Sequence, residues 1–338
     1  MSSSIQPEIG QTSSIGAVWP PEPVAHERLR GFYTRGVVQT ETDCQQIADV
    51  YASTISQLND HPDLTRMTIR FLVETPHLHM LEKLGVNIEA AIPICTDDED
   101  VVLAYAGYNA AERTAGDDTL RMHGNLLRKI VLKDQPEDRD RTDRLESAGI
   151  NAGIIDASTT SQQRHALQGQ FLRMYGIFGY DETDVAEILH NDDNTIIYLE
   201  VDGEVVSTAM AERAQIPIAG FGDLELCEVT EASTLPYLRE LGLYKIASGL
   251  LLEHLLNRQS TSPVHAIYGE SNLAMPGVLI AGHKNGRRFS FFDRGRLGIS
   301  NPNFGLLQQN FHIEDGREQR PYNDFAVSYL PLNGQEVV

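Results

Sequence analysis

The sequence predicts a mixed α/β (α+β) protein of two domains, and three observations point to this class. The chain has 338 residues, enough for two domains of ordinary size, and 41% of them are hydrophobic. Residues 224–256 change from a strand period to a helix period within about eight residues. Residues 195–213 alternate as two strands around an Asp-Gly turn. A hairpin followed by strand, turn and helix is typical of a mixed α/β domain.

The charge of the chain limits the classes of partner. The formal net charge is −21 at pH 7, and so acidic a surface repels phosphate backbones. We therefore expect no nucleic-acid partner, and we expect a small-molecule amine to be favoured. No apolar run is long enough to cross a bilayer, and the first residues lack the pattern of an export signal. A cytoplasmic protein without a membrane partner is the expectation, and a homodimer is left open.

The cysteines favour neither a disulfide framework nor a metal site. Cys44, Cys95 and Cys227 are odd in number, far apart in the sequence and without metal-ligand spacing. We therefore expect free thiols and no metal.

The N-terminal part predicts a flexible arm, a small α/β domain and a linker. Residues 1–30 are rich in Ser, Gln, Gly and Pro, which is typical of a flexible arm, and residues 31–132 form the small domain. Residues 133–149 alternate in charge with almost no apolar residues, which indicates a linker or an exposed helix. Pro93 restricts its strand to a sheet edge. The small domain is expected to contain a helix from about Thr40, a strand over 66–73, a short helix from Pro76 to Gly85, and strands over 88–94 and 101–108.

Residues 150–338 predict the second and larger domain. Two helices come first, then an antiparallel pair, a strand-turn-helix unit, and finally strand, helix and strands. The expected elements are a helix capped by Thr160 or Ser161, a helix over 182–189, the hairpin 195–213, a strand over 224–235, a helix from Tyr244, a strand over 264–269, a helix over 272–281, and strands at about 288–293 and 325–330.

The turn inside the strand-turn-helix unit predicts an anion site. Pro236 ends the strand, Arg239-x-x-Gly242 forms the turn, and a helix begins directly after the glycine. The free N–H groups of a first helical turn and the positive end of the helix dipole attract a bound anion.

This stretch resembles the acyl-CoA pyrophosphate motif of the GNAT N-acetyltransferases. In that motif, hydrophobic-x-Val-x-Pro-x-x-Arg-x-x-Gly-x-Gly/Ala, the register is kept by Thr234, Pro236, Arg239 and Gly242, and Tyr244 departs from it. The resemblance implies a GNAT fold for residues 150–338, with a partial GNAT-like unit as one option for the smaller domain, and it implies acetyl-CoA as co-substrate. The implied cofactor contacts are Thr234, Leu235, Arg239, Glu240, Leu241, Gly242, Leu243, Tyr244 and Asn272.

Further motifs resemble the β-lysine N-acetyltransferase family over most of residues 40–332. Residues 77–113 are similar to its N-terminal half, and residues 228–236 to its Glu-x-Thr-Glu-x-Ala-Thr-Leu-Pro. This resemblance implies acetylation of the ε- or β-amino group of a small diamino acid. The arginine-rich segment 284–304 contains Arg287, Arg288, Arg294 and Arg296; it departs from the family pattern and leaves an anionic acceptor open.

Acetyl transfer to an amine needs a base, because alkyl amines are mostly protonated at neutral pH. Glu228 and Glu231 are the candidates, acting through water, since they lie on the strand of the central motif. Three residues apart in a regular strand means opposite faces, so only a bulge brings both to one site. A backbone N–H near Thr234 or Leu235 would polarise the carbonyl.

The acid that protonates the leaving thiolate is less clear in the sequence. Many GNAT enzymes use a tyrosine on the helix after the next strand, and Leu279 occupies that position here. Tyr268, Tyr244, His283 or solvent are the substitutes. Two alternatives stay open: a GNAT acyltransferase with another acyl donor or an anionic or peptide acceptor, and an inactive GNAT-fold binding module.

Overall fold

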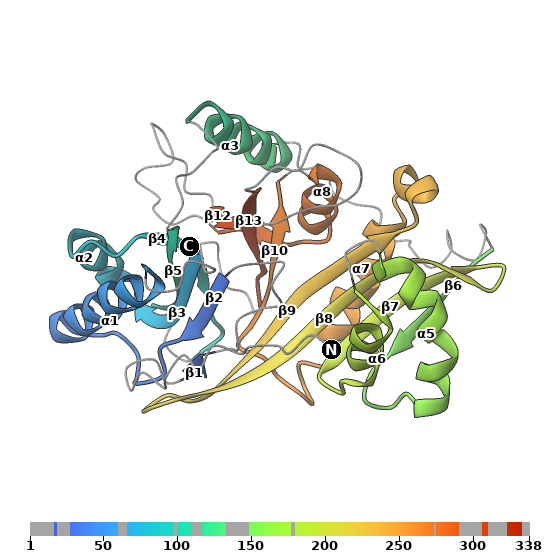
Figure 1. Cartoon of the computed structure of the whole chain (residues 1–338), viewed down its shortest axis with the longest axis horizontal. Helices are drawn as coiled ribbons and strands as arrows, with labels where there is room; N and C mark the ends of the chain where they lie inside the picture. The colour runs from blue at the N-terminus through green and yellow to red at the C-terminus, as the bar shows by residue number, and fades with distance from the viewer. Residues whose placement is uncertain are drawn as a thin grey trace.

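The computed structural model describes residues 17–18, 28–59, 66–96, 100–109, 117–132, 149–176, 180–273, 275–290, 306–309 and 323–332. These residues form a five-stranded sheet in the N-terminal half and an eight-stranded sheet in the C-terminal half (Figure 1). Helices accompany both sheets, which confirms the expected mixed α/β class.

The N-terminal sheet has the strand order β1-β2-β3-β5-β4. Helices α1 (Glu41–Asn59) and α2 (Leu78–Lys83) cover one face of this sheet. The 3₁₀ turn η1 (Thr75–His77) directly precedes α2. The edge position of β4 confirms the prediction from Pro93. The strands are β1 (Ala17–Val18), β2 (Arg28–Phe32), β3 (Arg66–Glu74), β4 (Ile88–Pro93) and β5 (Val101–Asn109).

Part of the expected flexible arm belongs to this sheet. β2 pairs in parallel with β3 from Arg28 onward, and β1 pairs antiparallel with β2. The composition of residues 1–30 did not reveal this pairing, because strand partners distant in sequence leave no local signal. The charged linker lies mostly outside the described residues, which resume at Gly149.

Helix α3 (Asp117–Leu132) was not predicted, and it packs against the C-terminal half of the chain. Leu127 and Ile130 share an apolar cluster with Leu279 and Phe289. The segment assigned to the small domain therefore also covers part of the larger one.

The C-terminal sheet has the order β11-β13-β10-β9-β8-β7-β6, with β12 paired to β13. The pairing of β9 with β10 is parallel, and the other pairings in this sheet are antiparallel. The strands are β6 (Ile150–Ile155), β7 (Asn194–Val201), β8 (Glu204–Ile218), β9 (Gly222–Thr234), β10 (Ala266–Asn272), β11 (Arg288–Phe289), β12 (Leu306–Gln309) and β13 (Asn323–Leu330).

Helices lie on both faces of the C-terminal sheet. Helices α5 (Ser161–Tyr175) and α6 (Glu182–His190) pack on the face that carries Ile196 and Met210. Helix α7 (Leu243–Asn257) packs on the opposite face, beside α8 (Pro276–Lys284). We call these the α5 face and the α7 face.

The order of elements expected of a GNAT fold is present in this half of the chain. Two helices, the β7–β8 hairpin, β9 followed by α7, and β10 followed by α8 and β13 succeed one another. Thr160 caps α5 in a capping box, as predicted. Asp202 and Gly203 have positive φ angles of 51° and 81°, which fits the predicted hairpin turn.

Several details of the prediction are wrong. Asn272 was expected to start a helix, but it ends β10, because pairing with β13 extends to Asn272 and Phe325. α8 begins only at Pro276. Strands β6 and β12 were not expected, and β8 reaches Ile218 rather than Arg213.

The two sheets share one apolar core on the α5 face. Phe32, Leu72 and Tyr105 of the N-terminal sheet pack with Leu226 and Tyr268 of the C-terminal sheet. The long β8–β9 hairpin extends under the N-terminal sheet (Figure 1), and beside its tip Ala219 N–H donates to the carbonyl of Thr34 at 2.8 Å. The smaller unit thus braces the hairpin that carries the central motif.

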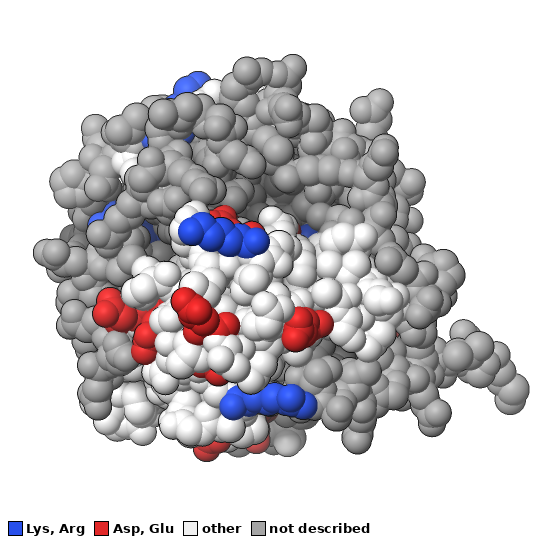
Figure 2. Space-filling model, turned by 90° about the vertical axis from the view of Figure 1, so that its left-hand side faces the viewer, with Lys and Arg blue, Asp and Glu red and all other residues white. Residues whose placement is uncertain are grey.

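The surface of the α1 and α2 side shows single charges of both signs rather than a basic patch among the coloured residues (Figure 2). Within the described ranges, no helix combines the length and the apolar character needed to span a bilayer. All three cysteines are free thiols, as expected.

Candidate active site

Strands β9 and β10 pair over a short distance and then part. Their parallel register joins Ala266 to Leu226 and ends with Tyr268 opposite Glu228. Beyond this point β9 continues beside β8, and β10 continues beside β13, without a pair between them. We call the region beyond Glu228 and Tyr268 the strand split.

A bulge in β9 lies at the strand split. The register with β8 shifts so that Glu231 and Ala232 lie between the pairs Met210–Thr230 and Thr208–Ser233. Glu231 has φ 26°, a left-handed conformation that non-glycine residues rarely adopt and that stores about 1 to 3 kcal/mol of strain. Such a distortion is typical of functional sites.

The bulge brings the two candidate bases to one face. Tyr180 follows α5 in the sequence. Its hydroxyl donates a hydrogen bond to Oε1 of Glu231 at 2.7 Å. The Tyr268 hydroxyl donates to Oε2 of Glu228 at 2.9 Å, on the side of the N-terminal sheet. Both carboxylates therefore lie on the α5 face, as the sequence required of a shared site. Glu212, which sequence reasoning missed, lies opposite Glu228 on β8 and shares this face.

Glu228 belongs to a buried charge cluster between the two sheets. Nη1 of Arg70 lies 3.9 Å from Oε2 of Glu228, and Nη2 donates to Oε1 of Glu270 at 2.7 Å. Arg30 reaches the other oxygen of Glu270 at 3.1 Å. Burial lowers the pKa of Arg70, but the surrounding tyrosine and glutamate oxygens outweigh burial and hold it well above its ordinary value. Arg70 therefore remains charged in this cluster.

The tyrosines on the α5 face have raised pKa values and keep their hydroxyl protons. Burial raises the pKa of Tyr180, and the Glu231 carboxylate raises it further. Burial likewise raises the pKa of Tyr268, whose proton points to Glu228. These phenols orient the carboxylates as neutral donors. Tyr268 was a candidate acid for the thiolate, and the structure places its hydroxyl on the face of the base instead.

The expected anion site lies at the start of α7. The residues before α7 form the 3₁₀ helix η3 (Pro236–Leu241), and Gly242 takes the left-handed conformation with φ 73°. Gly242 is the N-cap residue of α7 and has no side chain that could cap the helix. Uncapped N–H groups at a helix N-terminus suit a pyrophosphate.

The predicted contacts of this turn differ in exposure. Leu241 and Arg239 are exposed, and Arg239 Nε donates to the carbonyl of Thr234 at 3.4 Å. Leu243 is buried, and the side chain of Glu240 lies outside the described residues. Leu235 N–H donates to the carbonyl of Val206 at 3.0 Å, so this N–H is not available to polarise a carbonyl as expected.

Tyr244 and Asn272 are both directed into the protein. Tyr244 packs against the apolar cluster under α7 rather than over the turn. Asn272 is buried, and strand alternation puts it on the same face of β10 as Tyr268 and Glu270. His283 is buried too, and its ring stacks on Phe289 with centroids 6.0 Å apart.

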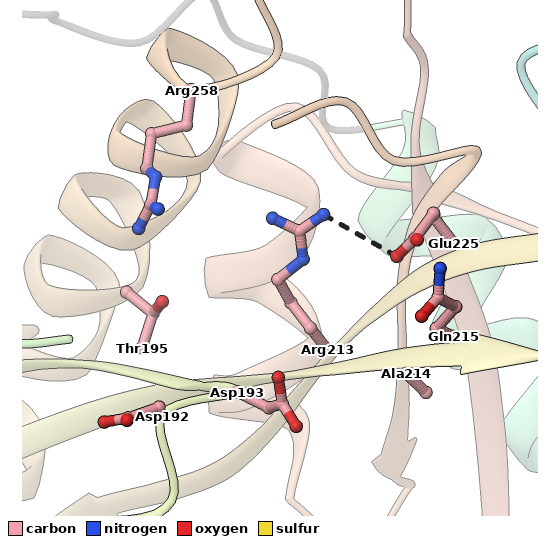
Figure 3. A pocket seen from close by; sticks show the side chains of 8 residues that line it. All are labelled: Asp192, Asp193, Thr195, Arg213, Ala214, Gln215, Glu225 and Arg258. Carbon is pink, nitrogen blue, oxygen red and sulfur yellow. Dashed lines mark ion pairs between the residues drawn. The ribbon is translucent and has the colours of Figure 1, made fainter. Parts of the chain in front are cut away.

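An open pocket of about 520 Å³ lies away from these residues, near the C-terminal end of α7 (Figure 3). In it Arg213 points toward Glu225, with 3.8 Å between Nη2 and Oε2. The pocket contains none of the predicted site residues. Its lining is Asp192, Asp193, Thr195, Arg213, Ala214, Gln215, Glu225 and Arg258. Across the described part of the chain, no group of three or more His, Cys, Asp or Glu side chains is arranged to hold a metal ion.

Comparison with known proteins gives matches to solved structures only. No family model matches the chain, and no curated protein matches it. A structure of Arabidopsis thaliana NAA60 in complex with acetyl-CoA is similar over 55% of this chain and 99% of its own, with 14% identity and a TM-score of 0.38.

Two bacterial structures give similar values. An N-acetyltransferase from Staphylococcus aureus Mu50 matches over 54% of this chain and 96% of its own, with 8% identity and a TM-score of 0.35. The ribosomal-protein-S18-alanine N-acetyltransferase from Escherichia coli matches over 56% and 99%, with 14% identity and a TM-score of 0.35. The assignment of the C-terminal half to a GNAT fold rests on its order of elements and on the bulged β9, and not on these comparisons.

Proposed function

We propose that the chain is an N-acetyltransferase that moves an acetyl group from acetyl-CoA to the amino group of a small cationic amine. A diamino acid such as β-lysine is the first acceptor to test. One observation carries the proposal: the bulge in β9 turns Glu231 to the same face as Glu228, where β9 and β10 part.

The donor fits two features that lie close together in sequence. The uncapped start of α7 suits the pyrophosphate, with Gly242 allowing close approach of the backbone. The strand split leaves edges of β9 and β10 unpaired with each other, and these edges suit the amide groups of a pantetheine arm. Both features belong to the elements that the GNAT resemblance assigned to the cofactor.

The acceptor fits the acidic character of the α5 face. Glu212, Glu228 and Glu231 all lie there, and a protonated amine entering this region meets carboxylates from two strands. Opposite charges attract the amine and concentrate it at the site. An anionic acceptor would meet the same carboxylates with repulsion.

We assign the base to Glu231 rather than Glu228 on geometry. Glu228 lies in the buried charge cluster, 3.9 Å from Nη1 of Arg70, whereas Glu231 lies on the bulge and accepts a hydrogen bond from Tyr180. In this scheme Glu231 takes the amine proton through water, the free amine attacks the thioester carbon directly, and Glu228 holds the cationic amine before deprotonation.

The test combines binding with turnover. Saturating acetyl-CoA should stabilise the protein, by about 2.7 kcal/mol at a hundredfold excess over Kd. Free thiol release is then followed with lysine, β-lysine, other diamines, a monoamine and an anionic amine. Release with cationic amines supports the proposal. The absence of both stabilisation and thiol release would contradict it and favour the inactive binding module.

Variants separate the base from the fold. Glu231→Gln should lower kcat by about 10² to 10⁴ and Glu228→Gln by less, while acetyl-CoA still stabilises both proteins. Glu225→Gln, on the same strand but in the distant pocket, is the matched control. Unchanged turnover in both site variants would remove the assignment of the base.

A further inference from the structure

Arg287 is delivered to the interior by the end of α8. Gly286 adopts φ 94°, and Arg287 N–H donates to the carbonyl of Gly282 at 3.0 Å, which turns the chain back along the helix. The left-handed conformation at Gly286 is one that glycine adopts without strain. The arginine side chain is therefore aimed beneath α8 rather than out into solvent, and only 2% of the residue is exposed.

Two glycines form the slot that holds this side chain. A methyl group on Gly269 would lie 2.5 Å from Nη1 of Arg287 and 2.7 Å from the carbonyl oxygen of Val229. A methyl group on Gly282 would lie 2.7 Å from Nε and closer still to Nη2. Because Gly269 directly follows the last β9–β10 pair, Nη1 lies at the strand split, on the α7 face.

The guanidinium has no counter-charge in the described part of the chain. Nη1 is buried without a hydrogen-bond partner, and no carboxylate there forms an ion pair with Arg287. The nearby Tyr244 phenol is neutral, since burial raises its pKa. An unpaired buried charge costs several kcal/mol, so it is retained where a ligand supplies the opposite charge.

Acyl transfer from a thioester creates such a charge. When the amine attacks, the carbon–nitrogen bond forms, the carbon–sulfur bond breaks, and its electron pair stays on sulfur. The ammonium first gives one proton through water to the glutamate, which releases it to solvent. The second proton leaves the nitrogen by the same route as the amide forms, so the sulfur leaves as an anion. On α8, Leu279 is buried in an apolar cluster and offers no proton.

We propose that Arg287 stabilises the leaving thiolate of the acyl donor at the strand split, an inference that rests on the proposed acetyl-transfer function. The amine and its base act from the α5 face, and the sulfur departs toward the α7 face, where Nη1 lies. Arg287 keeps its own proton throughout, and the thiolate takes a proton from solvent after release. The guanidinium thus takes over the electrostatic part of the role that an acid would have.

The thiol pKa of bound CoA tests this directly and needs no acceptor. The thiolate absorbance of the CoA complex is titrated against pH, and the complex with desulfo-CoA is subtracted to remove the protein's own thiols and phenols. In the unmodified protein we expect the bound thiol pKa to lie about 1 to 3 pH units below that of free CoA. A bound thiol that titrates as in free CoA overturns the proposal, whatever the variants do.

Three variants sharpen the result. Arg287→Met should return the thiol pKa to its free value, and Arg287→Lys should keep part of the shift. Arg258→Met, at the far end of α7, should leave it unchanged. With acetyl-CoA and an accepted amine, Arg287→Met should lower kcat about 100-fold with little change in the KM for the donor. A shift that persists in Arg287→Met assigns the effect elsewhere and also overturns the proposal.

The two proposals fail in different ways. If CoA does not bind at all, the proposal of a transferase function is itself contradicted. If CoA binds and acetyl transfer occurs, but the thiol pKa is that of free CoA, only the role of Arg287 is lost.

Discussion

Two buried arginines lie against opposite faces of β10, and their surroundings differ in one respect. Arg70, on the α5 face, contacts the Tyr268 hydroxyl at 3.0 Å and Glu270 at 2.7 Å. Arg287, on the α7 face, lies against Gly269 with Nη1 unpartnered. One charge is balanced within the protein, and the other is not.

The difference separates a structural charge from one that fits a ligand. The Arg70 cluster joins strands about 200 residues apart in sequence, and its opposite charges cancel in the folded protein. Among the described residues, Arg287 forms no ion pair that would join distant strands in this way. The two glycines of the slot give the guanidinium space, and the slot lies beside the strand split, where we propose that the acyl donor binds.

The largest effect we expect is from Arg70→Met. This change removes the cation beside Glu228 and leaves Glu270 with Arg30 alone, and it should lower the free energy of unfolding by about 3 to 5 kcal/mol in urea denaturation. Adding Glu270→Gln should restore part of the loss, because the uncompensated charge is then removed. A loss below about 1 kcal/mol in the single variant would mean that the cluster is not a structural pair.

A smaller effect should follow from filling the Arg287 slot. Gly282→Ala places a methyl group against the guanidinium and should destabilise the protein by about 1 to 3 kcal/mol. In an Arg287→Ala background the same change should be nearly neutral, since the space is free. Equal losses in both backgrounds would show that the guanidinium does not occupy the slot in solution.

The smallest effect concerns a group that stays uncharged. Burial lowers the pKa of His265, and its Nδ1 accepts the N–H of Glu225 at 2.9 Å. The unfolded chain therefore binds the proton more tightly, and stability is lost as pH falls below the ordinary histidine pKa of about 6.5. We expect a loss below about 1 kcal/mol between pH 7 and 5, measured by urea denaturation. His265→Asn should flatten this slope, and a parallel slope would assign the titration elsewhere.

Local patterns predicted the elements around the site well. Pro236 ends β9 and Gly242 precedes α7, and both breaks are visible in the sequence because proline and glycine restrict or free the backbone. Helix α3 was missed, since its apolar residues adjoin a charged segment that dominates the composition. Asn272 was misplaced because the length of β10 depends on its distant partner β13.

The site was predictable only in part. The pair Glu228 and Glu231 follows from chemistry and position on one strand, and strand geometry requires a bulge for both to reach one face. The neighbours that define their chemistry are Tyr180 and Arg70, and neither is local in sequence. The placement of Arg287 also escaped detection, because its slot needs two glycines from different elements to lie on either side of it.

The β8–β9 hairpin has a wider consequence for the architecture. Its far end is held by the N-terminal sheet, through Ile216 and Leu224 in the shared core and through Ala219 beside the tip, while its near end carries the bulge and Glu231. Substitutions in the smaller unit that shift the far end of this hairpin can therefore also shift the bulge and Glu231 at its near end. Residues far from any substrate thus belong to the set on which selection for activity acts.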